Sequence, residues 1–320
     1  MENETLVEQI GRKIAETKTV VTHFGDDLDN KSSIYALERW AKEKGYLAEG
    51  ETLQVKRVPA GQTVVGMLNV DTGGHKGNRT EEDGTIVIDG DSANNVKSAA
   101  ESIHKLGIYV PEQIVEVADT RPARVSAMDS RSGLALIRYL SGEQAFRLAE
   151  EGLIDKSLTD EEIERFGLTE AHRKQQEIID NAIEKINKYT TKIEDGTEIV
   201  LAPEQILAGS QIAYEMGIEY YASASEHRDA DKNVDGVTFA ITSKPGVKLP
   251  ERVLEYGRQL VEEYRIDEKS SGVFVNPNGQ MIVAGGFKNP TFRIPNQTVK
   301  GMLDVIEAKF AGKEISKVQE

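Results

Sequence analysis

The sequence predicts an α/β protein in which an N-terminal domain on a parallel sheet is joined by a helical connector to a smaller C-terminal α/β domain. Short β-branched runs alternate with helical stretches, which is typical of a parallel sheet covered by helices. The chain has 320 residues, and a domain usually takes about 100–200. A charged stretch without expected strands, residues 142–192, separates two groups of strands. We therefore expect domains over residues 1–150 and 196–320, with the connector over 151–195.

The N-terminal half alternates expected strands with expected helices. Apolar and β-branched residues dominate the strands, and Ile34, Leu37 and Trp40 have the spacing of one helix face. Gly45 and Gly107 follow the helices, as is common at helix ends. The expected strands are 19–22, 52–58, 63–70 and 85–88, and the expected helices are 32–44 and 93–106.

The C-terminal half begins a second α/β unit after the turn at residues 194–196. Its short apolar runs again alternate with helical stretches. The expected strands are 198–201, 219–224, 236–242, 272–275 and 280–284, and the expected helices are 203–216, 250–264 and 298–310.

The composition excludes several kinds of site and partner. The chain has no cysteine, which excludes thiolate nucleophiles, disulfides and cysteine metal sites and leaves His and carboxylates as strong metal ligands. Acidic residues outnumber basic ones 54 to 39, so the chain does not coat duplex DNA with a basic surface. No apolar run approaches the roughly 20 residues of a membrane span. Residues 1–8 lack the features of a signal peptide, and we expect a cytoplasmic protein with no membrane partner.

Acidic residues follow several of the expected strands. Asp27 and Asp29 follow the first, Asp71 the third, and Asp89 and Asp91 the fourth. One such Asp is as easily a turn or N-cap residue, but ligands of open α/β sheets bind beyond the carboxyl ends of the strands. Carboxylates gathered there raise one another's pKa unless a cation neutralises them. Oxygen-rich sites with His favour Mn²⁺ or Mg²⁺ over zinc, so we expect one or two such ions.

His23, Asp27 and Asp29 have the spacing H-x-x-x-D-x-D. A loop just beyond a strand end can aim all three side chains into one space. The alternative is a turn with an N-capping Asp and a His that belongs to the core. The triplet alone leaves both interpretations open.

The order of these motifs resembles the DHH phosphoesterase superfamily. That group includes RecJ-like exonucleases, small-oligonucleotide and cyclic-dinucleotide phosphodiesterases, and manganese-dependent inorganic pyrophosphatases. The first motif matches His23, Asp27 and Asp29 with a nearby Ser, and the third matches Asp89 followed by the Ser-Ala-rich segment 98–101. Residues 273–286 resemble the strand and glycine turn of the DHH-associated substrate-binding domain. The resemblance implies that Mn²⁺ or Mg²⁺ is held by His23, Asp27, Asp29, Asp71, Asp89 and Asp119.

The chain departs from the family pattern at two places. Gly90 and Asp91 stand where the family has two histidines that bind metal and contact the phosphate. Asp91 can replace a metal ligand, but it donates a hydrogen bond only when it is protonated. The glycine run of the C-terminal domain lacks its usual His and reads Ala284-Gly285-Gly286-Phe287-Lys288-Asn289.

A glycine-rich segment, residues 71–79, offers a compensation for the missing histidines. Its glycines let backbone N–H groups approach an anion, while Lys76 and Arg79 add positive charge and His75 adds a donor. The alternative is a flexible connection before the next strand. We expect catalytic roles for His75 and Asp91. Substrate contacts are expected from Lys76, Arg79, Arg121, Arg124, Gly285, Gly286, Lys288 and Arg293.

Two functions from different classes stay open. One is a metal-dependent phosphoesterase that hydrolyses a phosphodiester or phosphoanhydride by metal-activated water, on a nucleotide, cyclic dinucleotide, short oligonucleotide or pyrophosphate-like substrate. The other is a catalytically inactive protein of the same fold that binds a nucleotide or phosphorylated ligand. An NAD-type dehydrogenase and a serine hydrolase are disfavoured, because G-x-G-x-x-G after the first strand and G-x-S-x-G are absent. Whether the chain forms a homodimer stays open.

Overall fold

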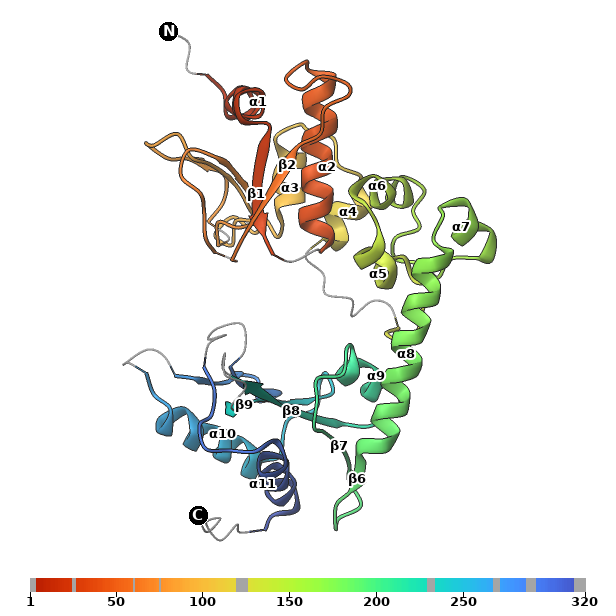
Figure 1. Cartoon of the computed structure of the whole chain (residues 1–320), viewed down its shortest axis with the longest axis vertical. Coiled ribbons are helices and arrows are strands. Elements are labelled where there is room, and N and C mark those ends of the chain that lie inside the picture. The colour runs from red at the N-terminus through yellow and green to blue at the C-terminus, as the bar shows by residue number, and fades with distance from the viewer. Residues whose placement is uncertain are drawn as a thin grey trace. The chain divides into compact units, whose positions relative to one another are not determined.

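Figure 1 shows a computed structural model of the chain, which divides into two compact units, Met1–Gln175 and Gln176–Glu320. The boundary falls within helix α8 (Thr169–Tyr189). The predicted α/β class is confirmed, while the predicted division into catalytic, connecting and substrate-binding parts stays a prediction. The structure describes residues 4–24, 27–59, 61–74, 76–118, 126–228, 234–266, 271–285 and 292–313.

Unit 1, Met1–Gln175, is built on a five-stranded sheet in the order β2-β1-β3-β5-β4. Strands β2, β1, β3 and β5 are parallel, and β4 pairs antiparallel with β5. Because parallel strands end at the same edge of the sheet, the segments that follow β1, β3 and β5 lie close together. The strands are β1 (Thr19–His23), β2 (Gln54–Val58), β3 (Leu68–Val70), β4 (Arg79–Thr80) and β5 (Ile86–Ile88).

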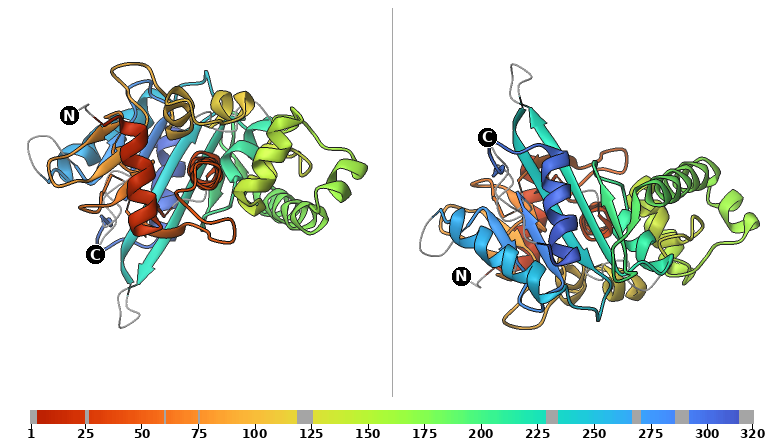
Figure 2. Two further views of the ribbon diagram at one scale, coloured as in Figure 1. Left: turned by 90° about the horizontal axis from the view of Figure 1, so that it is seen from above. Right: turned by 90° about the horizontal axis from the view of Figure 1, so that it is seen from below.

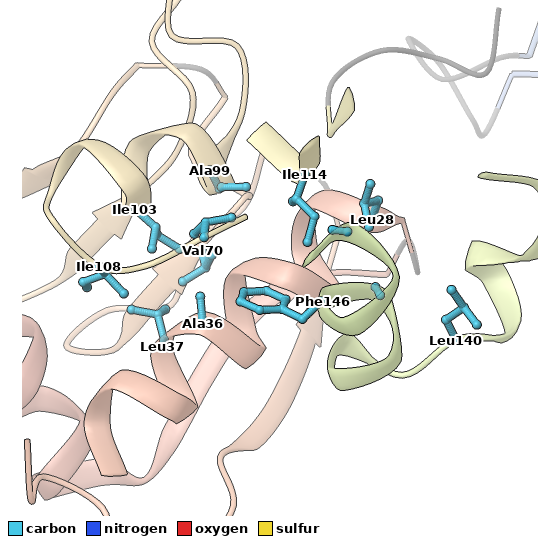
Figure 3. Close-up of a cluster of buried hydrophobic side chains, with 14 of the residues drawn as sticks. Leu28, Ala36, Leu37, Val70, Ala99, Ile103, Ile108, Ile114, Leu140 and Phe146 are labelled. Atoms are coloured by element: carbon cyan, nitrogen blue, oxygen red, sulfur yellow. The ribbon is translucent and has the colours of Figure 1, made fainter. Parts of the chain in front are cut away.

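The helices of unit 1 share one apolar core with this sheet. Figure 3 shows Val70 of β3 in one cluster of buried side chains with Leu37, Ile103 and Phe146. Removing apolar surface from water contributes roughly 25 cal/mol per Å², so this packing fixes the helices that flank the strand ends. The helices are α1 (Leu6–Thr17), α2 (Leu28–Glu43), α3 (Ala99–Lys105), α4 (Glu112–Val117), α5 (Gly133–Leu136), η1 (Ile137–Tyr139), α6 (Gly142–Glu150) and α7 (Asp160–Arg165).

Unit 2, Gln176–Glu320, has a six-stranded sheet in the order β10-β11-β9-β8-β7-β6. Its neighbouring strands are antiparallel except for the parallel pair β7 and β8. Helices α10 and α11 pack side by side against the sheet over a second apolar core (Figure 2, right). The strands are β6 (Thr190–Lys192), β7 (Glu198–Ala202), β8 (Tyr220–Arg228), β9 (Val234–Ser243), β10 (Val273–Val275) and β11 (Met281–Ala284), and the helices are α9 (Gly209–Glu215), α10 (Glu251–Glu263) and α11 (Val299–Ala311).

Four predictions about elements are wrong. The helix expected over residues 203–216 spans only Gly209–Glu215. The strand expected over residues 63–70 begins only at Leu68, and β6 forms at Thr190–Lys192, inside the stretch expected to hold no strand. The helix expected from residue 93 begins at Ala99, because Asp91 closes a turn before it and the Ser98 side chain accepts the N–H of Glu101 as its cap.

No described helix combines the length and the apolar character that crossing a membrane requires.

Candidate metal centre

The first motif lies at the junction of β1 and α2. Val20 and Val21 are fully buried and fix the strand, and the half-buried His23 ends it. Asp27 is the N-cap of α2, with its Oδ1 accepting the N–H of Asn30 at 3.0 Å. The interpretation of Asp27 as an N-cap and its prediction as a metal-site residue are therefore compatible, because a carboxylate has a second oxygen.

Asp71 follows β3 in a strained backbone conformation. Its φ is +55°, in the left-handed region that non-glycine residues seldom adopt. Its N–H donates to the carbonyl of Ile88 at 2.9 Å, so the neighbouring strand β5 holds this backbone in place. The carboxylate reaches the ring of His23, with 2.9 Å between Oδ2 and Nε2.

His23, Asp27 and Asp71 form a three-residue cluster, called here the metal cluster. One ligand atom from each residue lies within 4.8 Å of the others. The Nε2 of His23 lies 3.3 Å from Oδ2 of Asp27 and 2.9 Å from Oδ2 of Asp71. Divalent ions hold oxygen and nitrogen ligands at about 2.0–2.6 Å, so the three atoms are close enough to share one ion after small side-chain shifts.

Hydrogen bonds and charges within the metal cluster shift the pKa of each of its members. Hydrogen bonds to Asp27 and then Asp71 raise the pKa of His23 to about 10. Burial and the charges of Asp27 and Asp89 raise the pKa of Asp71 above its usual value, although the bond from His23 opposes them. The pKa of Asp27 is lowered, because the bonds from His23 and the Asn30 N–H outweigh its burial. A divalent ion in place of the proton on Nε2 of His23 would offset the repulsion between the carboxylates of Asp27 and Asp71.

Asp29 lies in the first turn of α2 and is 6% exposed. Its oxygens accept the N–H groups of Ala99 at 2.9 Å and Ala100 at 2.7 Å, in the first turn of α3. Burial and then the charge of Asp71 raise its pKa well above the usual value, despite these two bonds. Asp29 therefore lies near the metal cluster but ties α2 to α3, and its role as a ligand stays a prediction.

Asp89 follows β5 and is 2% exposed. Its Oδ1 accepts the N–H of Gly90 at 2.7 Å, and its charge contributes to the raised pKa of Asp71. A Cβ on Gly73 would lie 3.0 Å from Oδ2 of Asp89 and 2.5 Å from Cγ1 of Val87. Only glycine therefore fits where the glycine-rich segment passes Asp89.

The carboxylate of Asp91 closes its own turn. Its Oδ1 accepts the N–H groups of Ala93 and Asn94, and its Oδ2 accepts the Asn94 side-chain amide at 2.6 Å. The Asn94 side-chain bond is the main cause of its lowered pKa. Asp91 is therefore ionised and cannot donate to phosphate, and it is not among the three residues of the metal cluster.

The glycine-rich segment runs beside the third motif. Lys76 pairs with Asp91 in an isolated antiparallel bridge, and the N–H of Gly77 donates to the carbonyl of Gly90 at 2.8 Å. Lys76 is exposed, while Arg79 bonds Glu81 at 3.0 Å. The segment thus lies beside Gly90 and Asp91, and the Arg79 side chain bonds Glu81.

Gly285 and Arg293 lie together in unit 2. Gly285 has φ +70°, and a Cβ there would lie 2.4 Å from the carbonyl oxygen of Phe292 and 3.4 Å from Nη1 of Arg293. The same Nη1 donates to the carbonyl of Phe292 at 2.6 Å. Their role as substrate contacts stays a prediction. Six further predicted site residues lie outside the described part of the chain: His75, Asp119, Arg121, Arg124, Gly286 and Lys288.

The sequence analysis missed one side chain that bonds a residue of the metal cluster and one that follows the cluster residue His23 in the sequence. Arg57, in β2, donates from Nη1 to the carbonyl of His23 at 2.9 Å. Phe24 directly follows His23 and is 67% exposed. The place of Arg57 near the end of a strand parallel to β1, where it pairs in register with Thr22, could have indicated this contact.

No protein-family model and no curated protein matches the chain. Solved structures do resemble it. The pGpG-specific phosphodiesterase PggH from Vibrio cholerae is 13% identical with a TM-score of 0.44, covering 92% of this chain and 99% of that one. A RecJ exonuclease bound to manganese is 12% identical with a TM-score of 0.41, covering 98% and 94%. RecJ from Thermus thermophilus in complex with Mn²⁺ is 11% identical with a TM-score of 0.42, covering 98% and 55%.

Proposed function

We propose that the chain is a metal-dependent phosphoesterase that hydrolyses a phosphodiester or phosphoanhydride of a nucleotide or short oligonucleotide. The observation that carries the proposal is the convergence of one imidazole nitrogen and two carboxylates within 4.8 Å at the carboxyl ends of the parallel strands β1 and β3. Ligands of open α/β sheets bind beyond such strand ends.

The donor set fits Mn²⁺ or Mg²⁺. It is rich in carboxylate oxygen and contains one imidazole, which suits these ions better than zinc. His23, Asp27 and Asp71 would hold the ion, and Asp29 and Asp89 are the proposed additional ligands. A bound ion of this kind lowers the pKa of water and stabilises negative charge on a phosphoryl group.

The chain's own residues prepare the site before substrate arrives. The strained Asp71 backbone is held by β5, and the bonds of Asp29 to Ala99 and Ala100 lock α2 against α3. Ligands held this firmly need little reorganisation when an ion or a phosphate binds. The proposed substrate contacts are those predicted from the sequence: Lys76, Arg79, Arg121, Arg124, Gly285, Gly286, Lys288 and Arg293.

The exposed ring of Phe24 favours a nucleotide over pyrophosphate. Phe24 is 67% exposed and follows His23 directly, so its Cα lies about 3.8 Å from that of His23. A nucleobase can stack on such a ring at a gain of roughly 1–3 kcal/mol. Pyrophosphate offers no apolar face and gains nothing from it.

A catalytically inactive phosphate-binding protein is the second candidate. The turn bonds of Asp91 favour it, because they leave that residue ionised and unable to replace a histidine donor. This candidate predicts ligand-dependent thermal stabilisation without product formation.

The two candidates separate in an assay of the purified chain with Mn²⁺ and bis-p-nitrophenyl phosphate, a dinucleotide and pyrophosphate. We expect hydrolysis of the dinucleotide that stops with EDTA and falls at least about 100-fold in Asp71→Asn, since a direct ligand costs more than the roughly 10–100-fold of outer partners. The matched control is Asp195→Asn, a turn-capping Asp of unit 2. Hydrolysis that persists in EDTA or in Asp71→Asn would refute the proposal.

A further inference from the structure

Strand β2 brings one cationic side chain to the metal cluster. It lies at the edge of the sheet and pairs with β1 alone. Gln54, Val55 and Lys56 are exposed, whereas Arg57 is half-buried. The Nη1 of Arg57 donates to the carbonyl of His23 at 2.9 Å, so the guanidinium is fixed beside the last residue of β1.

The charge of Arg57 acts on the cluster as well. It is one of the charges that lower the pKa of Asp27, after the bonds from His23 and the Asn30 N–H. A guanidinium stays protonated in proteins and therefore repels a divalent ion held by the same carboxylates. A site whose only task is to hold an ion is weakened by such a neighbour.

An anion bound beside the ion reverses this balance. A phosphoryl group is attracted by the ion and by the guanidinium together, and a guanidinium presents five N–H donors in a fork that matches phosphate oxygens. The contact with the His23 carbonyl holds the fork in place, which reduces the entropy lost when a ligand binds.

Other cationic side chains of the described site are less well placed for this task. Arg79 bonds Glu81 at 3.0 Å and the carbonyl of Gly77 at 3.4 Å. Lys76 is exposed in the glycine-rich segment. Arg57, by contrast, bonds the backbone of His23, a member of the metal cluster.

We propose that Arg57 binds a phosphoryl oxygen of the substrate at the metal cluster and neutralises part of its negative charge. This inference rests on the proposed function and deepens it, because it assigns the substrate's phosphate to the side of the cluster that borders β2. The ligand class is a phosphate ester or free phosphate.

The test compares Arg57→Met and Arg57→Lys with the matched control Lys56→Met, an exposed neighbour on the same strand. Calorimetry measures Mn²⁺ binding to each full-length chain, and then inorganic phosphate binding to the Mn²⁺-loaded chain. We expect Arg57→Met to bind Mn²⁺ at least as tightly as the wild type and to bind phosphate about 10–100-fold more weakly, the loss typical of a charged hydrogen bond. Arg57→Lys retains part of the phosphate affinity, and Lys56→Met retains all of it.

Three results would overturn the inference. The inference is overturned if the wild type binds no phosphate, if Arg57→Met binds it as tightly as the wild type, or if Arg57→Met loses Mn²⁺ affinity, since Arg57 then only supports the ligands. If thermal unfolding shows that Arg57→Met does not fold, the phosphate and Mn²⁺ affinities of Arg57→Lys are compared with those of the wild type instead. If Arg57→Met weakens phosphate binding but the wild type hydrolyses nothing, the inference stands and the proposed hydrolysis fails.

Discussion

Acidic residues follow both β1 and β5, yet the two strand ends differ. At the end of β1, Asp27 gives one oxygen to the N-terminus of α2 and turns the other toward His23, where Asp71 meets it. Beyond β5, both carboxylate oxygens of Asp91 accept hydrogen bonds from the backbone and the Asn94 side chain of its own turn. The comparison indicates that an Asp after a strand contributes to a site only where its local hydrogen bonds leave one carboxylate oxygen facing the neighbouring strands. The variants below test that difference.

The largest expected effect is a loss of hydrolysis without a loss of stability. Asp71→Asn keeps the shape, suits the left-handed backbone and removes the repulsion from Asp27 and Asp89. We expect it to lose at least about 100-fold in kcat/KM, as above, while its metal-free unfolding temperature stays equal or rises. A lower unfolding temperature with activity intact would mean that Asp71 is structural.

Asp29, unlike Asp71, should lower the stability of the fold when it is replaced. Asp29→Ala leaves the N–H groups of Ala99 and Ala100 without their buried acceptor. Losses of this kind total about 2–4 kcal/mol, which urea unfolding in EDTA measures. Asp29→Asn keeps one acceptor oxygen and serves as the matched control. Equal stability of Asp29→Ala and the wild type would contradict the assigned bracing role.

Variants of Phe24 test whether the substrate is a nucleotide or pyrophosphate. Phe24→Ala removes the exposed ring of the residue that follows His23 and should raise KM for a dinucleotide about 5–50-fold, as expected for one lost stacking contact. KM for pyrophosphate should not change, and Phe24→Trp should retain the dinucleotide KM. Equal KM values for Phe24→Ala and the wild type on the dinucleotide would argue against base stacking.

Asp91 should give the smallest effect on metal binding. Asp91→Asn keeps an acceptor for the turn, so we expect Mn²⁺ affinity within about 3-fold of the wild type, below the roughly 10-fold threshold typical of ligand partners. A loss as large as that of Asp71→Asn would support the sequence-based prediction that Asp91 acts in the site.

Much of the N-terminal fold was predictable because its strands are short apolar runs with clear ends, as in β1 and β5. Helix α1 was missed, although Thr5 and Glu8 form a capping box at its start. The two-residue β4 gives no periodic signal at all.

The metal cluster was predictable in part. His23 and Asp27 lie four residues apart across a strand end, and Asp71 follows from the rule for parallel strands. The turn of Asp91 was not anticipated, because its hydrogen bonds to Ala93 and Asn94 are local and compete with any role in the site. Arg57 was missed because its contact depends on the register of β2 against β1.

The central claim is that His23, Asp27 and Asp71 bind a divalent ion, and calorimetric titration of the full-length, chelator-free chain with Mn²⁺ tests it most directly. We predict saturable binding of one or two ions that Asp71→Asn abolishes and Asp195→Asn preserves. Absence of binding at saturating Mn²⁺, or equal binding by Asp71→Asn and the wild type, would contradict the claim.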